Sequence, residues 1–424
     1  MKYISFDFRD DKFIPFDHPW SFQAAQEVAN HNFEQISFSE SRQIDDKYLV
    51  VIEPSGGYTH IFDSRKQSDI NILKVLKNDL KNETGIGELY QDLLSKKCNV
   101  FFLCKESSCL NTELFFLRMN ELCEDLNLDK KQFYFLIPEF YINDYKSNEF
   151  NILWYPYYIF NMFWWSMKRT YKVKQFYDTY MEYSKCFLRQ KHFVSTNNRA
   201  RGHRTWLLFI FSKNNLLDKG YISYLVNNND SDNQYSLKEV ERDIRHIYEE
   251  YEPEGLPDED TIKEFYKKLP IECDTKSDTL IQTRESNIAI QGVLLHSYFN
   301  VVTEAEYGFG DNFLQSVFLT EKIWKPILAY QPFIIVTNSY YLKALKELGF
   351  KTFSPFIDET YDEVHGYEKL KLIEVEINRL CNMSIEEIDK WYWEMEDILV
   401  YNCNHLIEIV EKSVDDIHSF LSKV

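Results

Sequence analysis

The sequence has few of the residues that mark fibrous or linker-dominated chains. Of its 424 residues only 12 are glycine and 11 are proline, which excludes a collagen-like chain and a protein made mostly of linkers. Hydrophobic residues make up 44% and charged residues 27%, a composition typical of a folded chain. The length exceeds one ordinary domain and favours two or three.

Basic residues are outnumbered by acidic ones. Lysine and arginine total 48 against 67 aspartates and glutamates, which gives a formal net charge of −19. A protein that coats nucleic acid normally needs the opposite balance, so we expect no broad nucleic-acid surface. The balance still allows a local basic pocket for a small anion.

The eight cysteines include no CxxC pair, so we expect no zinc site and interpret them as reduced thiols of a cytoplasmic protein. The first residues, MKYISFDFRDDKF, lack the apolar core of a signal peptide. The most apolar run, 154–167, has 14 residues, fewer than the roughly 20 that span a bilayer. We interpret it as a buried aromatic cluster between domains, with a peripheral membrane or partner contact as the alternative.

Two stretches of the chain alternate strand-like and helix-like patterns. Short apolar runs typical of strands occur at residues 2–8, 47–52, 98–104, 133–137, 191–196, 221–226, 298–304 and 332–336. Near-continuous apolar strands that alternate with helices predict parallel sheets covered on both faces.

We therefore expect an α/β protein with two Rossmann-like domains facing a cleft and a helical C-terminal tail. The expected ranges are 1–185 for the N-terminal domain and 186–358 for the C-terminal domain, which carries an insertion near 227–260. Residues 359–424 show no strand pattern and are expected to form the helical tail.

A group of arginines follows one predicted strand, in STNNRARGHRTWLL (195–208). Arg199, Arg201 and Arg204 would crowd the strand end and the first turn of a helix, where unpaired N–H groups and the helix dipole are already positive. A bound diphosphate would resolve this conflict, because guanidinium groups match phosphate oxygens in pairs. Asn198 could add hydrogen bonds. The alternative is a set of arginines paired with acidic side chains.

A second charged segment opens a helix in VFLTEKIWKPILAYQPFIIV (317–336). Thr320 is a good N-cap, so Glu321 and Lys322 fall in the first turn. A glutamate there can accept both hydroxyls of a ribose, and a lysine there is unfavourable unless it faces an anion such as phosphate. Simple helix capping is the alternative.

These residues carry a resemblance. TEKIWKPILAYQPFIIV resembles the nucleotide-sugar motif of the α-1,3-fucosyltransferases. KHFVSTNNRARGHRTWLLFIFSKNNLLDKGYISY resembles a strand–Asn-Arg-Arg–helix segment of related bacterial and viral glycosyltransferase-like proteins. The resemblance implies a GT-B architecture, with an N-terminal acceptor domain and a C-terminal domain that binds the donor. It also implies a GDP- or UDP-linked sugar as donor, inversion at the anomeric carbon, and no metal or other cofactor.

The resemblance also implies roles for single residues. Glu321 would bind the ribose, Lys322 the diphosphate and Glu304 the region of the sugar, while one arginine, best Arg199, would clamp the phosphates. The full expected donor site is Asn198, Arg199, Arg201, Arg204, Glu304, Thr320, Glu321 and Lys322.

Two positions depart from the family motif. Ala305 stands where the family has an asparagine and Phe318 where it usually has a tyrosine, and the interval from Glu304 to Thr320 is longer than typical. The resemblance therefore leaves the sugar and the base open.

An inverting transfer needs a base for the acceptor hydroxyl. Glu53 ends a predicted strand before two glycines, and His60 follows closely, so both are candidate catalytic residues. Glu139, after the run at 133–137, is an alternative base. Each could instead be an ordinary surface or capping residue.

The sequence thus favours an inverting, metal-independent glycosyltransferase that moves a sugar from a nucleotide donor to a glycan or other hydroxyl acceptor. One alternative keeps the donor site and takes a hydroxymethylpyrimidine base in DNA as acceptor, which the net charge of −19 disfavours. The other is a non-catalytic nucleotide- or phosphosugar-binding protein, or a scaffold.

Overall fold

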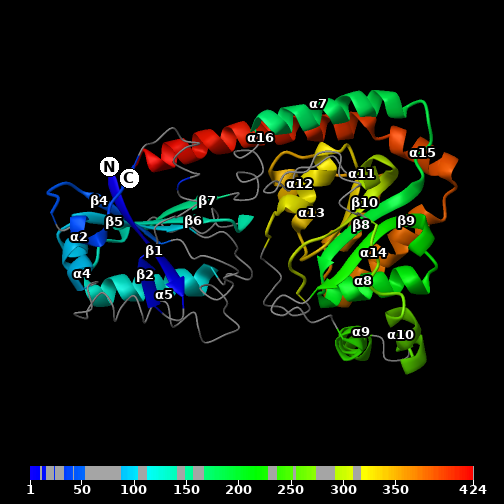
Figure 1. The fold of residues 1–424 in the computed structure, drawn as a ribbon, viewed down its shortest axis with the longest axis horizontal. Helices are drawn as coiled ribbons and strands as arrows, with labels where there is room; N and C mark the ends of the chain where they lie inside the picture. Colours follow the sequence, from blue (N-terminus) through cyan, green and yellow to red (C-terminus); the bar gives the residue numbers. More distant parts are fainter. Residues whose placement is uncertain are drawn as a thin grey trace. The chain divides into compact units, whose positions relative to one another are not determined.

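The chain divides into two compact units (Figure 1). Unit 1 comprises Met1–Trp164, Ser316–Leu319 and Val410–Val424, and unit 2 comprises Trp165–Gln315 and Thr320–Ile409. The computed structural model describes residues 1–9, 12–15, 23, 33–41, 43–52, 87–103, 112–140, 149–155, 167–227, 236–251, 255–273, 292–308 and 317–423.

Unit 1 contains a mainly parallel sheet. Its strands are β1 (Lys2–Arg9), β2 (Lys12–Pro15), β3 (Glu34–Gln35), β4 (Tyr48–Ile52), β5 (Cys98–Leu103), β6 (Phe133–Ile137) and β7 (Asn151–Trp154). The order is β2-β1-β4-β5-β6-β7, and β3 pairs with β1. Only β2 runs antiparallel to its neighbour among these described strands.

Both faces of the unit 1 sheet are buried. Even-numbered residues of β4 pack with side chains of α4 (Gly87–Leu94) and α5 (Thr112–Leu126). Odd-numbered residues of the same strand pack in a second cluster, to which α16 (Glu396–Leu421) contributes Ile417, Phe420 and Leu421. The period of two along a fully apolar strand explains why the sequence reads as a continuous hydrophobic run.

Unit 2 contains a four-stranded parallel sheet in the order β11-β10-β8-β9. Its strands are β8 (Lys191–Arg199), β9 (Gly220–Asn227), β10 (Ser297–Thr303) and β11 (Phe333–Val336). The chain leaves β8 toward one side to form β9 and returns on the other side of β8 to form β10 and β11. The strand order therefore reverses between β8 and β10, the point at which open α/β sheets form a crevice.

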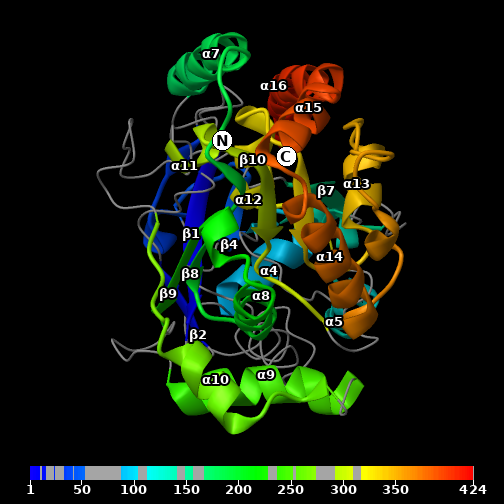
Figure 2. The ribbon, with the colours of Figure 1, turned by 90° about the vertical axis from the view of Figure 1, so that its right-hand side faces the viewer.

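Helix α8 (Gly202–Lys213) follows β8 and is buried from His203 to Phe211. It is covered by α9 (Leu237–Tyr251), which packs on it and on α10 (Glu259–Tyr266), as Figures 1 and 2 show. The side chains of α9 that are buried recur at helical spacing: Val240, Ile244, Ile247 and Tyr248. The described part of the insertion expected near 227–260 is thus a cover for α8.

The other helices of unit 2 are α7 (Met167–Ser184), α11 (Gly292–Leu295), α12 (Glu321–Leu328), α13 (Tyr341–Glu347), α14 (Gly366–Cys381) and α15 (Ile385–Trp393). The Tyr180 hydroxyl of α7 donates to the Leu295 carbonyl at 2.8 Å. Beside α7, Lys185 pairs with Glu396 of α16 at 2.7 Å. These contacts place α7 in unit 2, whereas the sequence analysis assigned it to the N-terminal domain.

The expected α/β fold class with two parallel-strand sheets and a helical C-terminal segment is confirmed. The helices after residue 358 do not form a separate part, because α14 and α15 belong to unit 2 and the end of α16 belongs to unit 1. The short strands β2, β3 and β7 were not expected from the sequence.

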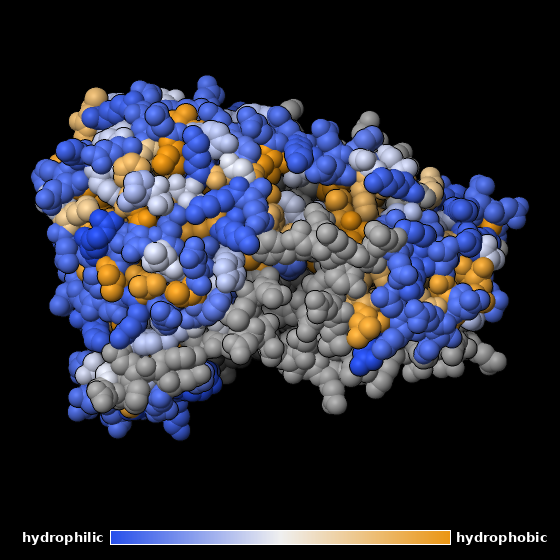
Figure 3. Space-filling model, turned by 180° about the vertical axis from the view of Figure 1, so that it is seen from behind, coloured by the Kyte–Doolittle hydropathy of each residue, from blue (hydrophilic) through white to orange (hydrophobic). Residues whose placement is uncertain are grey.

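Within the described part of the chain, no helix combines the length and the apolar character needed to cross a bilayer. On the face drawn in Figure 3, the coloured surface is mainly hydrophilic, with apolar residues in small separate groups. Residues 156–166, the centre of the apolar run proposed for a membrane or partner contact, lie outside the described residues.

Candidate functional site

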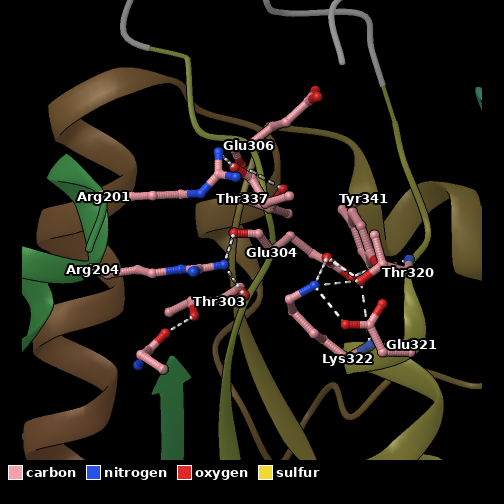
Figure 4. A network of polar contacts seen from close by, with 12 residues as sticks. Arg201, Arg204, Thr303, Glu304, Glu306, Thr320, Glu321, Lys322, Thr337 and Tyr341 are labelled. Atoms are coloured by element: carbon pink, nitrogen blue, oxygen red, sulfur yellow. Dashed lines mark hydrogen bonds and ion pairs between the residues drawn. The ribbon is translucent and has the colours of Figure 1, made fainter. Parts of the chain in front are cut away.

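Polar side chains gather at the carboxyl edge of the unit 2 sheet, where the strand order reverses (Figure 4). They come from the β8–α8 turn, from the segment after β10, and from the starts of α12 and α13. Carboxyl ends of parallel strands meet at one edge, so residues more than 100 positions apart in the sequence become neighbours.

Two arginines at the start of α8, the N-cap Arg201 and Arg204 in the first turn, bind the main chain at the end of β10. The Arg201 Nη1 group donates to the Ala305 carbonyl at 2.6 Å. The Arg204 Nη2 group donates to the carbonyls of Glu304 at 3.0 Å and Thr303 at 3.3 Å. Both guanidinium groups therefore hold the backbone at the end of β10, as Figure 4 shows.

Burial lowers the pKa values of Arg204 and His203 at the start of α8. Arg204 is only 5% exposed, and this burial, together with the charge of Arg201, lowers the pKa of its guanidinium to about 10. Burial and the same two arginine charges hold the pKa of His203 well below its ordinary value. His203 is therefore neutral near pH 7, and because a carbonyl can only accept, its Nε2–H donates to the Glu304 carbonyl at 3.1 Å.

Glu304 is the centre of the site. Its side chain is 2% exposed, and its Oε1 accepts from the Tyr341 hydroxyl at 2.8 Å and from the Thr320 amide at 3.3 Å. Its Oε2 accepts from the Thr320 hydroxyl at 2.5 Å and lies 3.9 Å from the Lys322 ammonium. A buried carboxylate needs such partners, because an ion in a dry interior is otherwise costly.

Helix α12 begins at this carboxylate. Thr320 is its N-cap, and the Thr320 hydroxyl accepts from the Lys322 amide at 3.3 Å and from the Lys322 ammonium at 3.1 Å. The same ammonium donates to Glu321 Oε1 at 2.9 Å. Thr320 thus ties the first turn of α12 to the end of β10 through Glu304.

The charges in the first turn of α12 are partly accessible. The side chains of Lys322 and Glu321 are 30% and 15% exposed. Burial raises the pKa of Glu321, but the ammonium groups of Lys322 and Lys325 outweigh it, and the net pKa is lowered. Glu321 is therefore an anion, and its buried Oε2 has no hydrogen-bond partner among the described residues.

The structure brings most of the predicted donor-site residues together. The group comprises Arg201, Arg204, Glu304, Thr320, Glu321 and Lys322. The side chains of Asn198 and Arg199, and the predicted catalytic residues Glu53 and His60, lie outside the described part of the chain. Arg201 and Arg204 were expected to bind a diphosphate or to pair with acidic side chains. The hydrogen bonds described above instead join them to main-chain carbonyls.

Glu139, the alternative base, lies in unit 1. It is 3% exposed, and its Oε1 accepts from the Val317 amide at 3.3 Å. The Phe140 amide donates to the Val317 carbonyl at 2.9 Å. In this arrangement Glu139 anchors the main chain just before Thr320.

Sequence reasoning missed several members of the site. Tyr341 opens α13 after β11, and nothing in the local pattern of that helix relates it to Glu304. Thr303 donates its hydroxyl to the Asn197 side chain, which joins the ends of β10 and β8. The signal that could have identified these residues is their position at or after the carboxyl ends of strands that the topology makes neighbours.

The described residues include no group of three or more His, Cys, Asp or Glu side chains placed to hold a metal ion. No known family model matches the sequence, and no curated protein matches it. The chain is similar to a solved structure, that of an α,α-trehalose 6-phosphate synthase from Burkholderia multivorans. The identity is 11% and the TM-score is 0.38, over 97% of this chain and 78% of that chain.

Proposed function

We propose that the protein is an inverting glycosyltransferase with a GT-B organisation, which moves a sugar from a nucleoside-diphosphate donor to a glycan or other hydroxyl acceptor. Unit 2 would hold the donor. One observation supports this proposal best: Glu304 joins a buried arginine and a partly exposed lysine at the sheet edge where α12 begins.

Lys322 is the proposed contact for the diphosphate. A cation in the first turn of a helix is unfavourable because the N-terminus is already positive, and its partial exposure leaves it accessible to an anion. The positive end of the α12 dipole adds to the attraction for phosphate oxygens. On binding, a phosphate oxygen would replace Glu321 Oε1 as the partner of the ammonium.

Glu321 is the proposed contact for the ribose. When Lys322 turns to the diphosphate, Glu321 Oε1 is released as an acceptor, and Oε2, which has no hydrogen-bond partner among the described residues, would accept as well once the side chain turns to the ligand. The vicinal hydroxyls of a ribose are two donors for these two oxygens. The lowered pKa of Glu321 keeps the group ionised, the form that accepts two hydrogen bonds.

The arginines support the leaving group. Transfer breaks the bond between the anomeric carbon and the diphosphate oxygen, and negative charge develops on the departing diphosphate. Arg201 and Arg204 place fixed positive charge beside the end of β10 without reorganising, which is how enzyme sites stabilise such charge. Asn198 and Arg199 complete this proposed donor site.

The acceptor oxygen attacks the anomeric carbon from the opposite side, and its proton passes to a base. Glu53 and His60 stay our candidates for that base. With fixed cations at the leaving group, the proposed reaction needs no metal, so added EDTA should leave turnover unchanged.

The donor site is tested by calorimetric titration with GDP, UDP and CMP and with GDP- and UDP-sugars. The wild-type protein should bind at least one nucleoside diphosphate, and Lys322→Ala should weaken that binding by about ten- to a hundredfold, the effect of losing a hydrogen bond to a charged group. Lys343→Ala is the matched control, because Lys343 is 62% exposed and its ammonium contacts only surface groups, in a 3.8 Å ion pair with Glu347 and 5.8 Å from the Tyr340 ring, among its described contacts. Equal affinity of wild type and Lys322→Ala would refute the site.

Turnover separates the enzyme from a binding protein. Release of the nucleoside diphosphate from the bound sugar donor, measured with glycan acceptors and with DNA containing hydroxymethylpyrimidine, should occur with one acceptor class. Tight donor binding with no release or hydrolysis under any of these conditions would favour the non-catalytic alternative.

A further inference from the structure

Tyr341 reaches the candidate site from an element that no sequence motif connects with it. It is the first residue of α13, is 1% exposed, and donates its hydroxyl to Glu304 Oε1 at 2.8 Å. Burial, followed by the nearby Glu304 charge, raises its pKa well above the ordinary value. The phenol therefore stays protonated and acts as a donor over the whole physiological pH range.

The Tyr341 hydroxyl gives Glu304 Oε1 a strong donor, as the Thr320 hydroxyl does for Oε2. Without it, Oε1 would keep only the Thr320 amide at 3.3 Å among its described contacts. Oε2 lies 3.9 Å from the ammonium of Lys322, whose side chain is 30% exposed. A carboxylate that loses a neutral donor in a dry site gains most by drawing in a charged one, so Glu304 would then compete for Lys322.

The backbone of Tyr341 is itself fixed. Asp362 accepts from the Tyr341 amide at 3.0 Å and from the Lys343 amide at 3.1 Å, and so caps the start of α13. Asp362 also pairs with the buried Lys369 at 3.6 Å. With its main chain held in this way, Tyr341 presents its hydroxyl to Glu304 from one defined direction.

We propose that Tyr341 is a positioning residue of the donor site: by holding Glu304 through its hydroxyl, it leaves the Lys322 ammonium available to a diphosphate. This inference rests on the function proposed above. Tyr341 touches no substrate; it acts through Glu304, and its effect should fall on phosphate binding alone.

Tyr341→Phe removes only the hydroxyl, and Tyr298→Phe is its matched control. Tyr298 is a fully buried tyrosine of β10 that also donates to a carboxylate, Asp389, at 3.0 Å, and it lies near the amino end of the strand. Tyr298→Phe should lose at least as much thermal stability as Tyr341→Phe, because the Tyr298 hydroxyl also accepts from the Arg189 amide at 2.9 Å. Only Tyr341→Phe should weaken binding of inorganic pyrophosphate, by about five- to tenfold.

The same titration with the parent nucleoside gives a second readout. Tyr341→Phe should bind the nucleoside as the wild type does, because only the lysine is affected. A double-mutant cycle with Glu304→Gln tests the route: the effect of Tyr341→Phe on pyrophosphate binding should shrink at least several-fold when the carboxylate charge is absent.

The outcomes separate the two claims. A wild-type protein that binds neither pyrophosphate nor a nucleoside diphosphate overturns the proposed function. Wild-type binding with an unchanged Tyr341→Phe affinity overturns the positioning role alone. So does an equal loss for pyrophosphate and nucleoside, or a Tyr341→Phe chain that fails to fold, since the hydroxyl would then serve the fold.

Discussion

Lys369 is a buried lysine, with 1% of its surface exposed. Its ammonium donates to the Asn338 carbonyl at 3.1 Å and pairs with Asp362 at 3.6 Å. Burial lowers the pKa of this lysine from 10.5 to about 8, although Asp362 opposes the shift. Between these two pH values the unfolded chain binds more protons at this lysine than the folded chain does.

Stability should therefore rise with pH in that window. Compared with a Lys369→Met chain, the wild type should gain up to about 3 kcal/mol of unfolding free energy as the pH rises from about 8 to about 10.5. Urea unfolding of both proteins across this range measures the difference, in which the other titrating groups cancel. If the unfolding free energies of the two proteins changed with pH in parallel, the lowered pKa of Lys369 would be contradicted.

The residues of the site differ in how far the sequence predicts them. Thr320, Glu321 and Lys322 could be placed because an N-cap and a first turn are set by local sequence. The partners of Arg201 and Arg204 could not, because their acceptors are main-chain carbonyls that no residue pattern encodes. Such contacts follow only from the register of β8 against β10.

Among the elements, buried strands were the most predictable. β4, β6 and β11 are buried at every residue, so each appears in the sequence as an uninterrupted apolar run. β2 is an edge strand of four residues and β3 is a pair of residues off the main strand order, and segments this short show little periodicity. The sequence therefore predicts strands that are buried along their whole length, and it does not predict the very short ones.

Gly220, the first residue of β9, is required by close packing. A Cβ atom there would lie 2.5 Å from the ring of Phe193, which is fully buried and packed against Phe211 and Phe299. Gly220→Ala should therefore lower the unfolding free energy by about 1–3 kcal/mol, the usual cost of overpacking.

Gly202→Ala is the natural control for that substitution. A Cβ at Gly202 would meet Asp243 at 3.8 Å, an ordinary contact, and alanine favours the first turn of α8. Denaturant midpoints of the two variants provide the comparison. Equal stability of the two alanine chains would show that the Phe193 ring can move aside.

At the scale of the whole molecule, the unit boundaries do not follow the order of the chain. Helix α16 starts in unit 2, and residues 410–424 belong to unit 1. The sequence analysis assigned a continuous range to each domain, because composition and periodicity indicate elements and do not indicate which sheet a helix covers. The sequence predicted residues 359–424 only as a helical tail, with no partner for it.

Phe420 shows what α16 contributes to unit 1. Its ring lies 6.0 Å from that of Phe101 and 5.8 Å from that of Tyr134, and it is 5% exposed. Phe420→Ala should destabilise unit 1 by about 3–5 kcal/mol. Amide hydrogen exchange in β5 should accelerate, while the neighbouring exposed Ser419→Ala should leave it unchanged; unaltered protection in the Phe420→Ala chain would exclude this role.

The place of residues 410–423 in the core of unit 1 has a consequence during translation. The described strands of that sheet leave the ribosome long before α16 is made, so one apolar face of the sheet stays exposed to water until its covering helix is synthesised. A nonsense codon anywhere in the second half of the gene would therefore harm the part of the protein already synthesised. Unit 1 is thus translated first, but its core is completed only by residues 410–423, which are translated after the strands of both sheets.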